Sequence, residues 1–313
     1  MALIIGVTLA PAIDRTARVE RLAFDTILRP TEMSVLPGGK GVNVCRAARL
    51  LGAQVATTGI CAGHAGRWLV EALEREGLGP RFETVDGETR TTYVTVDATG
   101  RSVLVYEAAA RVEQSAFERL LGRLRGDLAP SAWLVCAGSL PDGLADDAYA
   151  RLVRVAHDAR SSCLVDTGGV ALARALDERP DVVKVSVAEA RAALGAAAYA
   201  GALEMARRLA LGGARLAVVT DGPRGAAASE GERAWTIQVP RVKAVNPIGA
   251  GDAFSAGLVV ALAAGAAAHD ALAAGAAAAT ASVVQLGAGE LDPGRVAAVL
   301  ERVVVREVRR GRP

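Results

Sequence analysis

The feature of this sequence that most constrains its fold is a regular alternation of short β-branched runs with longer runs rich in Ala, Leu and Arg. The short runs, such as Leu3–Leu9, Val55–Gly59 and Leu216–Thr220, have the length and composition of buried strands. Strands that alternate with helices form a mostly parallel sheet, and the helices pack on both of its faces. The alternation of strands and helices therefore predicts an α/β/α sandwich.

Residue composition at the ends of the longer runs gives approximate bounds for the helices. Gly52 and Gly77 directly follow two of them, as is typical of helix C-termini. Further strands are expected at residues 133–137, 163–166 and 181–185, and helices at residues 42–51, 66–76, 146–160, 189–194, 202–211 and 253–264.

Two segments interrupt the alternation of strands and helices, and they predict a second, smaller sheet. Residues 88–107 hold two β-type runs, Thr92–Val96 and Ser102–Tyr106, on either side of a turn that ends at Gly100, which indicates a hairpin. We expect a β lid made of residues 11–37 and 87–108. The α/β core would then comprise residues 1–10, 38–86 and 109–313.

The predicted hairpin also suggests a homodimer. An isolated hairpin is marginally stable in water, so it should pair with the other lid segment and bury an apolar face. Val94, Val96, Val103 and Val105 alternate along the hairpin and would supply that face. A second copy of the chain is the simplest partner to cover it.

Composition excludes several other classes of protein. The net charge of +2 is too small to indicate nucleic-acid binding, and the cysteines, which show no CxxC spacing, are typical of reduced thiols in a cytoplasmic enzyme. The start of the chain, MALIIGVTLAPAID, lacks the basic residues of a signal peptide and is expected to be a core strand. The Ala-rich stretch 253–288 is interrupted by His269 and Asp270, which favours two buried helices over a membrane span.

Lysine is unusually rare in this chain. Of the 36 basic residues only Lys40, Lys184 and Lys243 are lysines. A lysine ammonium is compact, whereas an arginine guanidinium is wide and planar. The three lysines therefore mark positions where a compact cation is expected to be needed.

The strongest local motif is Asn246-Pro-Ile-Gly-Ala-Gly-Asp252, which lies directly before an apolar helix. Gly249, Ala250 and Gly251 would expose the first backbone N–H groups of that helix, where the helix dipole also attracts negative charge. The motif predicts an anion hole, and Asp252 within it can serve as a general base.

A second glycine-rich motif, Pro37-Gly-Gly-Lys-Gly-Val-Asn43, opens another helix. It is not a Walker A loop, because Gly rather than Ser or Thr follows Lys40. Its glycines would let the backbone approach a ligand closely. Lys40 and Asn43 supply a charge and an amide that can bind hydroxyl or phosphate groups.

Taken together, these motifs resemble the ribokinase-like, or PfkB, carbohydrate kinases over nearly the whole chain. The resemblance rests on Asp14 after the first strand, PGGKGVN, GSLPDG at 138–143, DTG at 166–168, TDGPRG at 220–225 and GAGD. The start TLAPAIDRT and the pair Thr89-Arg90 resemble the 1-phosphofructokinase and tagatose-6-phosphate kinase branch.

The resemblance implies ATP-dependent transfer of a phosphoryl group to a sugar hydroxyl, with Mg²⁺ as a second cofactor and Asp252 as the base. It also implies which residues bind each ligand. The sugar-binding residues would be Asp14, Gly38, Gly39, Lys40, Asn43 and Ser139, and the nucleotide-binding residues Lys184, Ser186, Thr220, Gly222 and Gly225. Glu189 would reach the metal through water, and Ser186 stands where the family usually has Asn.

A clamp of three cations predicts that the sugar already carries a phosphate. Arg29, Lys40 and Arg90 directed at one cleft would repel one another unless an anion bound between them, and Arg binds phosphate through a fork of donors. Fructose 1-phosphate, fructose 6-phosphate and tagatose 6-phosphate are the candidates, in that order. A kinase of an unphosphorylated sugar or nucleoside, and a non-catalytic sugar- or nucleotide-binding relative, are the alternatives.

Overall fold

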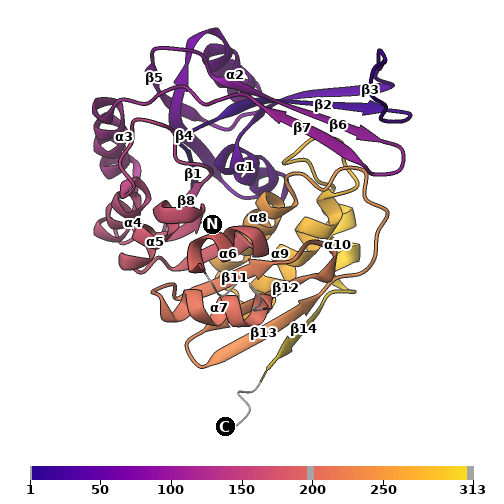
Figure 1. Ribbon diagram of the computed structural model, residues 1–313. Coiled ribbons are helices and arrows are strands. Elements are labelled where there is room, and N and C mark those ends of the chain that lie inside the picture. The colour runs from indigo at the N-terminus through magenta and orange to yellow at the C-terminus, as the bar shows by residue number, and fades with distance from the viewer. Residues whose placement is uncertain (1, 196–200, 309–313) are drawn as a thin grey trace.

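The predicted α/β/α sandwich is confirmed by a computed structural model, which describes residues 2–195 and 201–308 (Figure 1). Within these residues, ten strands form one sheet, and four form a second. The large sheet has the order β14-β13-β12-β11-β10-β9-β8-β1-β4-β5. Its strands are β1 (Ile4–Thr8), β4 (Val55–Ala62), β5 (Pro80–Val85), β8 (Trp133–Ala137), β9 (Ser162–Asp166), β10 (Val182–Ser186), β11 (Leu216–Thr220), β12 (Ala226–Glu230), β13 (Arg233–Gln238) and β14 (Val304–Glu307).

Strands β11 to β5 of the large sheet are parallel, and β12, β13 and β14 add an antiparallel edge. Every residue of β1 and β8 is buried, because helices cover both faces of the sheet. The helices are α1 (Lys40–Leu50), α2 (Gly63–Arg75), α3 (Gln114–Asp127), α4 (Ala148–Asp158), α5 (Gly169–Asp177), α6 (Val187–Leu194), α7 (Ala202–Leu211), α8 (Ala250–Ala263), α9 (Ala268–Ser282) and α10 (Pro293–Leu300), with a 3₁₀ turn η1 (Gly222–Arg224).

Two hydrophobic clusters hold the layers together. Helices α3 to α7 pack against one face of the sheet, around residues such as Leu120 and Leu152. Helices α1, α8, α9 and α10 pack against the other face, around residues such as Trp235 and Leu258. The sequence motifs that open α1 and α8 therefore lie on the same side of the sheet.

The Ala-rich stretch forms the two buried helices α8 and α9, as predicted, although their junction lies just before Ala268 rather than after it. Small residues let these helices come very close. A Cβ atom added at Gly257 would lie 2.5 Å from the carbonyl oxygen of Ala274. In the described part of the chain, none of the helices combines the length and the apolar character needed to cross a bilayer.

The second sheet, which we call the lid sheet, has the order β3-β2-β6-β7. It consists of β2 (Ala12–Val19), β3 (Glu32–Gly38), β6 (Arg90–Asp97) and β7 (Ser102–Tyr106), and it projects from one edge of the core (Figure 1). The predicted hairpin is confirmed, because β6 and β7 pair in antiparallel register around the turn at 98–101.

The prediction that four valines form one apolar face of the hairpin is wrong. Val94 pairs with Leu104, so Val103 and Val105 point to the opposite side of the sheet. Val94 and Val96 are buried against Leu286 of the core in the same chain. Val103 and Val105 are 45% and 56% exposed. The inner face of the lid sheet is thus covered by its own chain at Val94 and Val96, and the outer face is open.

The contact between α8 and α9 generates a stability prediction. Gly257→Ala should destabilise the protein by about 1–3 kcal/mol, because the added methyl group overpacks a closed backbone contact. Gly122→Ala is the matched control, since a Cβ at this exposed position of α3 would have no neighbour within 4 Å among the described residues. It should stabilise the helix by about 0.5–1 kcal/mol. Urea denaturation midpoints measure both effects, and equal shifts in the same direction would contradict the close packing.

Candidate functional site

A cavity of about 1600 Å³ lies between the lid sheet and the carboxyl ends of the parallel strands. This edge of an open α/β sheet is where ligands usually bind. Most of the predicted site residues line the cavity: Asp14, Gly39, Lys40, Asn43, Arg90, Ser139, Lys184, Ser186, Glu189, Thr220, Gly222, Gly225, Gly249, Ala250, Gly251 and Asp252. Gly38 and Arg29 are the predicted residues that do not line it.

The GAGD motif forms the N-terminus of α8 at the cavity wall. Gly249 is the N-cap, with a φ of 85° that favours glycine, and a Cβ atom there would lie 2.8 Å from the Cβ of Ala288. Asp252 lies in the first turn of α8, where backbone N–H groups have no partner within the helix. The predicted anion hole thus coincides with the N-terminus of α8, and its role stays a prediction.

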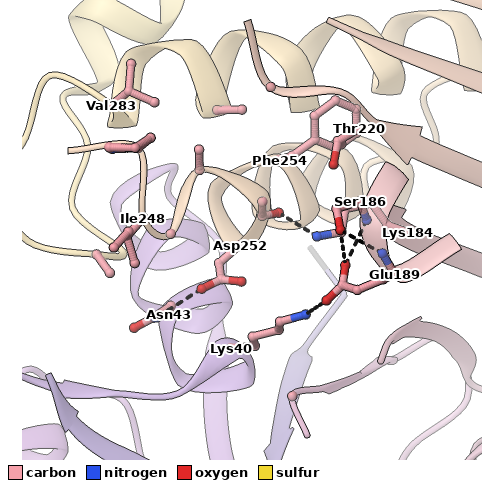
Figure 2. A pocket seen from close by; sticks show the side chains of 18 of the residues that line it. Lys40, Asn43, Lys184, Ser186, Glu189, Thr220, Ile248, Asp252, Phe254 and Val283 are labelled. Carbon is pink, nitrogen blue, oxygen red and sulfur yellow. Dashed lines mark hydrogen bonds and ion pairs between the residues drawn. The ribbon is translucent and has the colours of Figure 1, made fainter. Parts of the chain in front are cut away.

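Asp252 is buried beside an amide at the centre of the site (Figure 2). The Nδ2 of Asn43 donates a hydrogen bond of 2.9 Å to its Oδ2. Burial, together with the charge of Asp166, raises the pKa of Asp252 to about 7, although Lys184, Lys40 and the Asn43 hydrogen bond oppose this shift. A carboxylate with a pKa near neutrality can accept a proton at physiological pH.

Asp14 is a second carboxylate, contributed by the lid sheet. The hydroxyl of Thr92 on β6 donates to its Oδ1 at 2.5 Å. Gly38 lies against it so closely that an added Cβ would be 2.0 Å from Oδ2, which explains why glycine stands there. Burial raises the pKa of Asp14, while the hydrogen bonds from Thr92 and Asn43 oppose the shift. Asp14 and Asp252 are thus two carboxylates in a polar environment, and such an environment suits the hydroxyls of a sugar.

A cluster of four charged residues lies next to Asp252. Asp166, at the end of β9, is completely buried and contacts the ammonium groups of both Lys40 and Lys184. The Lys40 Nζ is 2.8 Å from Asp166 Oδ1 and 2.5 Å from Glu189 Oε1. Lys184 also donates to the carbonyl oxygen of Gly251 at 3.2 Å, so the cluster touches the first turn of α8 (Figure 2).

The ion pairs in this cluster favour the charged forms of Asp166, Glu189 and Lys40. Burial alone would raise the pKa of Asp166, but Lys184 and Lys40 hold it below its usual value. The pKa of Glu189 is also lowered, because Lys40 outweighs burial and the repulsion from Asp166. The pKa of Lys40 is raised despite burial, owing to the two carboxylates.

Ser186 and Glu189 form a capping box at the start of α6. The Glu189 backbone N–H donates to the Ser186 Oγ at 3.2 Å, and the Ser186 N–H and Oγ both donate to Glu189 Oε2 at 2.8 Å. Glu189 therefore has one oxygen bound to its own helix cap and the other to Lys40. Thr220 and the η1 turn at Gly222–Arg224 lie along the same wall.

The three cations of the predicted clamp do not converge within this chain. Arg29 is exposed in the segment between β2 and β3 and lies outside the cavity. Lys40 faces Asp166 and Glu189. Arg90 lines the cavity and donates to the Ala10 carbonyl at 3.2 Å, while its buried Nε has no hydrogen-bond partner among the described residues.

Sequence reasoning missed two residues of the site. The DTG motif contains Asp166 without assigning it a role, although a carboxylate at the end of a parallel strand is itself a signal for a ligand-binding edge. Tyr106, the last residue of β7, lines the cavity and pairs with Thr92 in the lid sheet. The alternation within the hairpin could have placed Tyr106 on the inner face.

Comparison with known proteins agrees with this geometry. The family described as "pfkB family carbohydrate kinase" matches residues 1–294. Phosphofructokinase-2 from Escherichia coli is 26% identical over 96% of this chain and 99% of its own, with TM-scores of 0.87 in its complex with potassium and 0.84 in its complex with fructose-6-phosphate.

Two further structures share the fold. A possible 1-phosphofructokinase from Thermotoga maritima is 24% identical, with a TM-score of 0.86, over 98% of this chain and all of that chain (100%). Ribokinase from Thermotoga maritima is 21% identical, with a TM-score of 0.73, over 96% of this chain and 99% of that chain. With the family match over most of its length, the chain belongs to the pfkB family of carbohydrate kinases and is an ATP-dependent sugar kinase.

Proposed function

We propose that this kinase transfers the γ-phosphoryl group of ATP to a hydroxyl of a sugar phosphate, with Asp252 as the general base. The observation that carries this proposal is the buried Asp252 carboxylate, whose pKa is raised to about 7, at the N-terminus of a helix inside the cavity. Phosphoryl transfer requires positioned reactants, stabilisation of negative charge and a group that takes the hydroxyl proton. The segment Gly249–Asp252 offers the stabilisation of negative charge and the group that takes the proton.

The proton would move from the acceptor hydroxyl to Asp252. The hydrogen bond from Asn43 fixes the orientation of this carboxylate and leaves its other oxygen toward the cavity. The backbone N–H groups at Gly249–Gly251 lie in the first turn of α8, where they can stabilise charge that develops on the transferring group. Asp14 would hold a second hydroxyl and so fix which oxygen faces Asp252.

A divalent cation fits the residues present. Within residues 2–195 and 201–308 there is no group of three or more Asp, Glu, His or Cys side chains suited to a metal. Glu189 nevertheless lines the cavity, Asp166 lies completely buried beside it, and the ammonium of Lys40 bridges the two carboxylates as a stand-in cation. These two residues would hold Mg²⁺ together with nucleotide phosphates, and the ion would neutralise charge on the phosphate oxygens.

Arg90 supports a phosphorylated substrate. Its guanidinium lies beside Asp14, and its Nε–H, which has no partner among the described residues, can donate to a phosphate oxygen. The relative from Escherichia coli that was solved with fructose-6-phosphate is consistent with this choice. Fructose 1-phosphate, fructose 6-phosphate and tagatose 6-phosphate remain the candidates. An unphosphorylated sugar or nucleoside is the alternative if Arg90 serves only to bind Ala10.

The outer face of the lid sheet supports a homodimer. Five of its large apolar side chains are between 39% and 56% exposed, namely Met33, Val35, Tyr93, Val103 and Val105. A contiguous apolar face of this kind usually marks an interaction surface. A second copy of the same chain would cover it with an identical face. A cytoplasmic location fits the four buried, free cysteines.

The assignment of Asp252 predicts a specific loss of turnover. Asp252→Asn should lower kcat by about 10²-fold or more, because the amide cannot accept the proton. Binding of a fluorescent nucleotide analogue should be retained, since the variant has nearly the same shape. Asp270→Asn, an exposed position on α9, is the matched control and should have normal turnover. Near-normal turnover of Asp252→Asn would exclude this residue as the base.

The same assignment fixes the pH dependence of the wild type. Only ionised Asp252 can accept a proton, so kcat/KM should fall about tenfold per unit as the pH drops below its pKa of about 7 and should level off above it.

The role of Arg90 predicts a change in substrate preference. Arg90→Ala should lower kcat/KM for the sugar phosphate by about 10- to 100-fold, as expected for a lost hydrogen bond to a charged group. The value for free fructose should change little and serves as the internal control. An ADP-release assay on both sugars measures the effect. Equal losses for both sugars, or a preference of the wild type for the free sugar, would favour the unphosphorylated alternative.

The proposed dimer predicts that one charge on the lid separates the subunits. Val105→Asp should give a monomer by light scattering at micromolar concentration, because it would bury a carboxylate in the apolar interface. Leu211→Asp is the control, since Leu211 is 80% exposed at the end of α7, away from the lid. A wild type that is monomeric and fully active would exclude the dimer.

A further inference from the structure

Two of the three lysines of this chain meet at one carboxylate. Lys40 and Lys184 come from different elements, α1 and β10, and both contact Asp166. Lys243 is exposed and does not line the cavity. In a chain that uses arginine at nearly every other basic position, this convergence indicates that Asp166 needs two compact cations.

The two ammonium groups are held in different ways. Lys184 is enclosed, with 3% of its side chain exposed, and a Cβ atom added at Gly251 would lie 2.9 Å from its Nζ. Lys40 is 32% exposed and faces the cavity. It is also the first residue of α1, where the helix dipole disfavours a cation. Among the described residues, Asp166 and Glu189 are the two that bind the Lys40 ammonium.

Lys40 completes a neutral cluster. Two carboxylates and two ammonium groups balance one another, and the second oxygen of Glu189 is already bound by the Ser186 cap. Without Lys40, the ammonium of Lys184 would still compensate Asp166, and Glu189 would keep an uncompensated negative charge at the cavity wall. Such a site attracts another cation.

We propose that Lys40 is an exchangeable counter-ion. Its ammonium occupies the carboxylate pair in the nucleotide-free enzyme, and a divalent cation that arrives with the nucleotide replaces it. The released ammonium, on a flexible stem at the cavity wall, then neutralises nucleotide phosphate oxygens. This inference rests on the proposed nucleotide-dependent function. It makes metal binding conditional on the nucleotide, because the free protein carries its own competitor for the site.

Binding of Mn²⁺ to the nucleotide-free protein, measured by the EPR signal of the free ion, tests this competition. Lys40→Met should bind Mn²⁺ at least about tenfold more tightly than the wild type, a difference of about 1.4 kcal/mol. Lys243→Met makes the same change in net charge away from the cluster and should bind as the wild type does. Lys40→Met combined with Glu189→Gln should lose the gain, because one of the two carboxylates is then neutral.

Equal Mn²⁺ affinity of Lys40→Met, Lys243→Met and wild type would overturn the proposal. This measurement needs no sugar and no turnover, so a missing kinase activity with an intact gain in Mn²⁺ affinity would refute only the proposed function. If Lys40→Met does not fold, a measurement on the wild type tests the proposal instead. After reductive ¹³C-methylation, the Lys40 signal should shift when Mg²⁺ and a non-hydrolysable ATP analogue are added together, and an unmoved signal would contradict the exchange.

Discussion

The site is organised around one buried charge, the carboxylate of Asp166. Taking an ion out of water costs several kcal/mol unless opposite charges and hydrogen bonds compensate for the lost hydration. Here the compensation comes from two ammonium groups, and each of them contacts a further element. Lys184 reaches the first turn of α8, and Lys40 reaches Glu189 on α6. A single carboxylate at the end of β9 thus fixes the relative positions of four neighbouring elements.

The same cluster tunes the proton affinity of Asp252. Burial and the negative charge of Asp166 raise its pKa, whereas the two lysines limit the rise. The folded-state pKa therefore lies above the value of about 3.8 for an unperturbed aspartate. As the pH rises from about 4 to 7, ionisation of Asp252 opposes folding, so its contribution to the free energy of unfolding decreases. The arrangement that would suit Asp252 to the proposed role of base also destabilises the protein.

The sequence was sufficient for the layers of the fold and for naming most of the residues that line the cavity, because both depend on local signals. Hydrophobic periodicity located the parallel strands except β5, and glycines before an apolar run located the starts of α1 and α8. Features that depend on register were harder to predict. Whether Val94 and Val103 share a face follows from the offset between β6 and β7, which the turn sequence alone did not settle.

Electrostatic contacts between residues far apart in the chain were also hard to predict from the sequence. Lys40 has the same motif context whether it faces a substrate phosphate or two carboxylates more than a hundred residues away in the chain. Only the assembled sheet brings Asp166 and Glu189 to it. Arg29 shows the reverse case, since a cation in the correct predicted segment ends up outside the cavity of its own chain.

The pairing within the lid sheet has a consequence for the order of folding. The hairpins β2–β3 and β6–β7 are each local, but β2 and β6 run parallel and pair Asp14 with Thr92. A parallel pair needs a crossover, and here the crossover contains α1, β4, α2 and β5 of the core. Closing so long a loop is entropically unfavourable until those elements have packed. The half of the site that holds Asp14 is therefore assembled late, on a scaffold that has already folded.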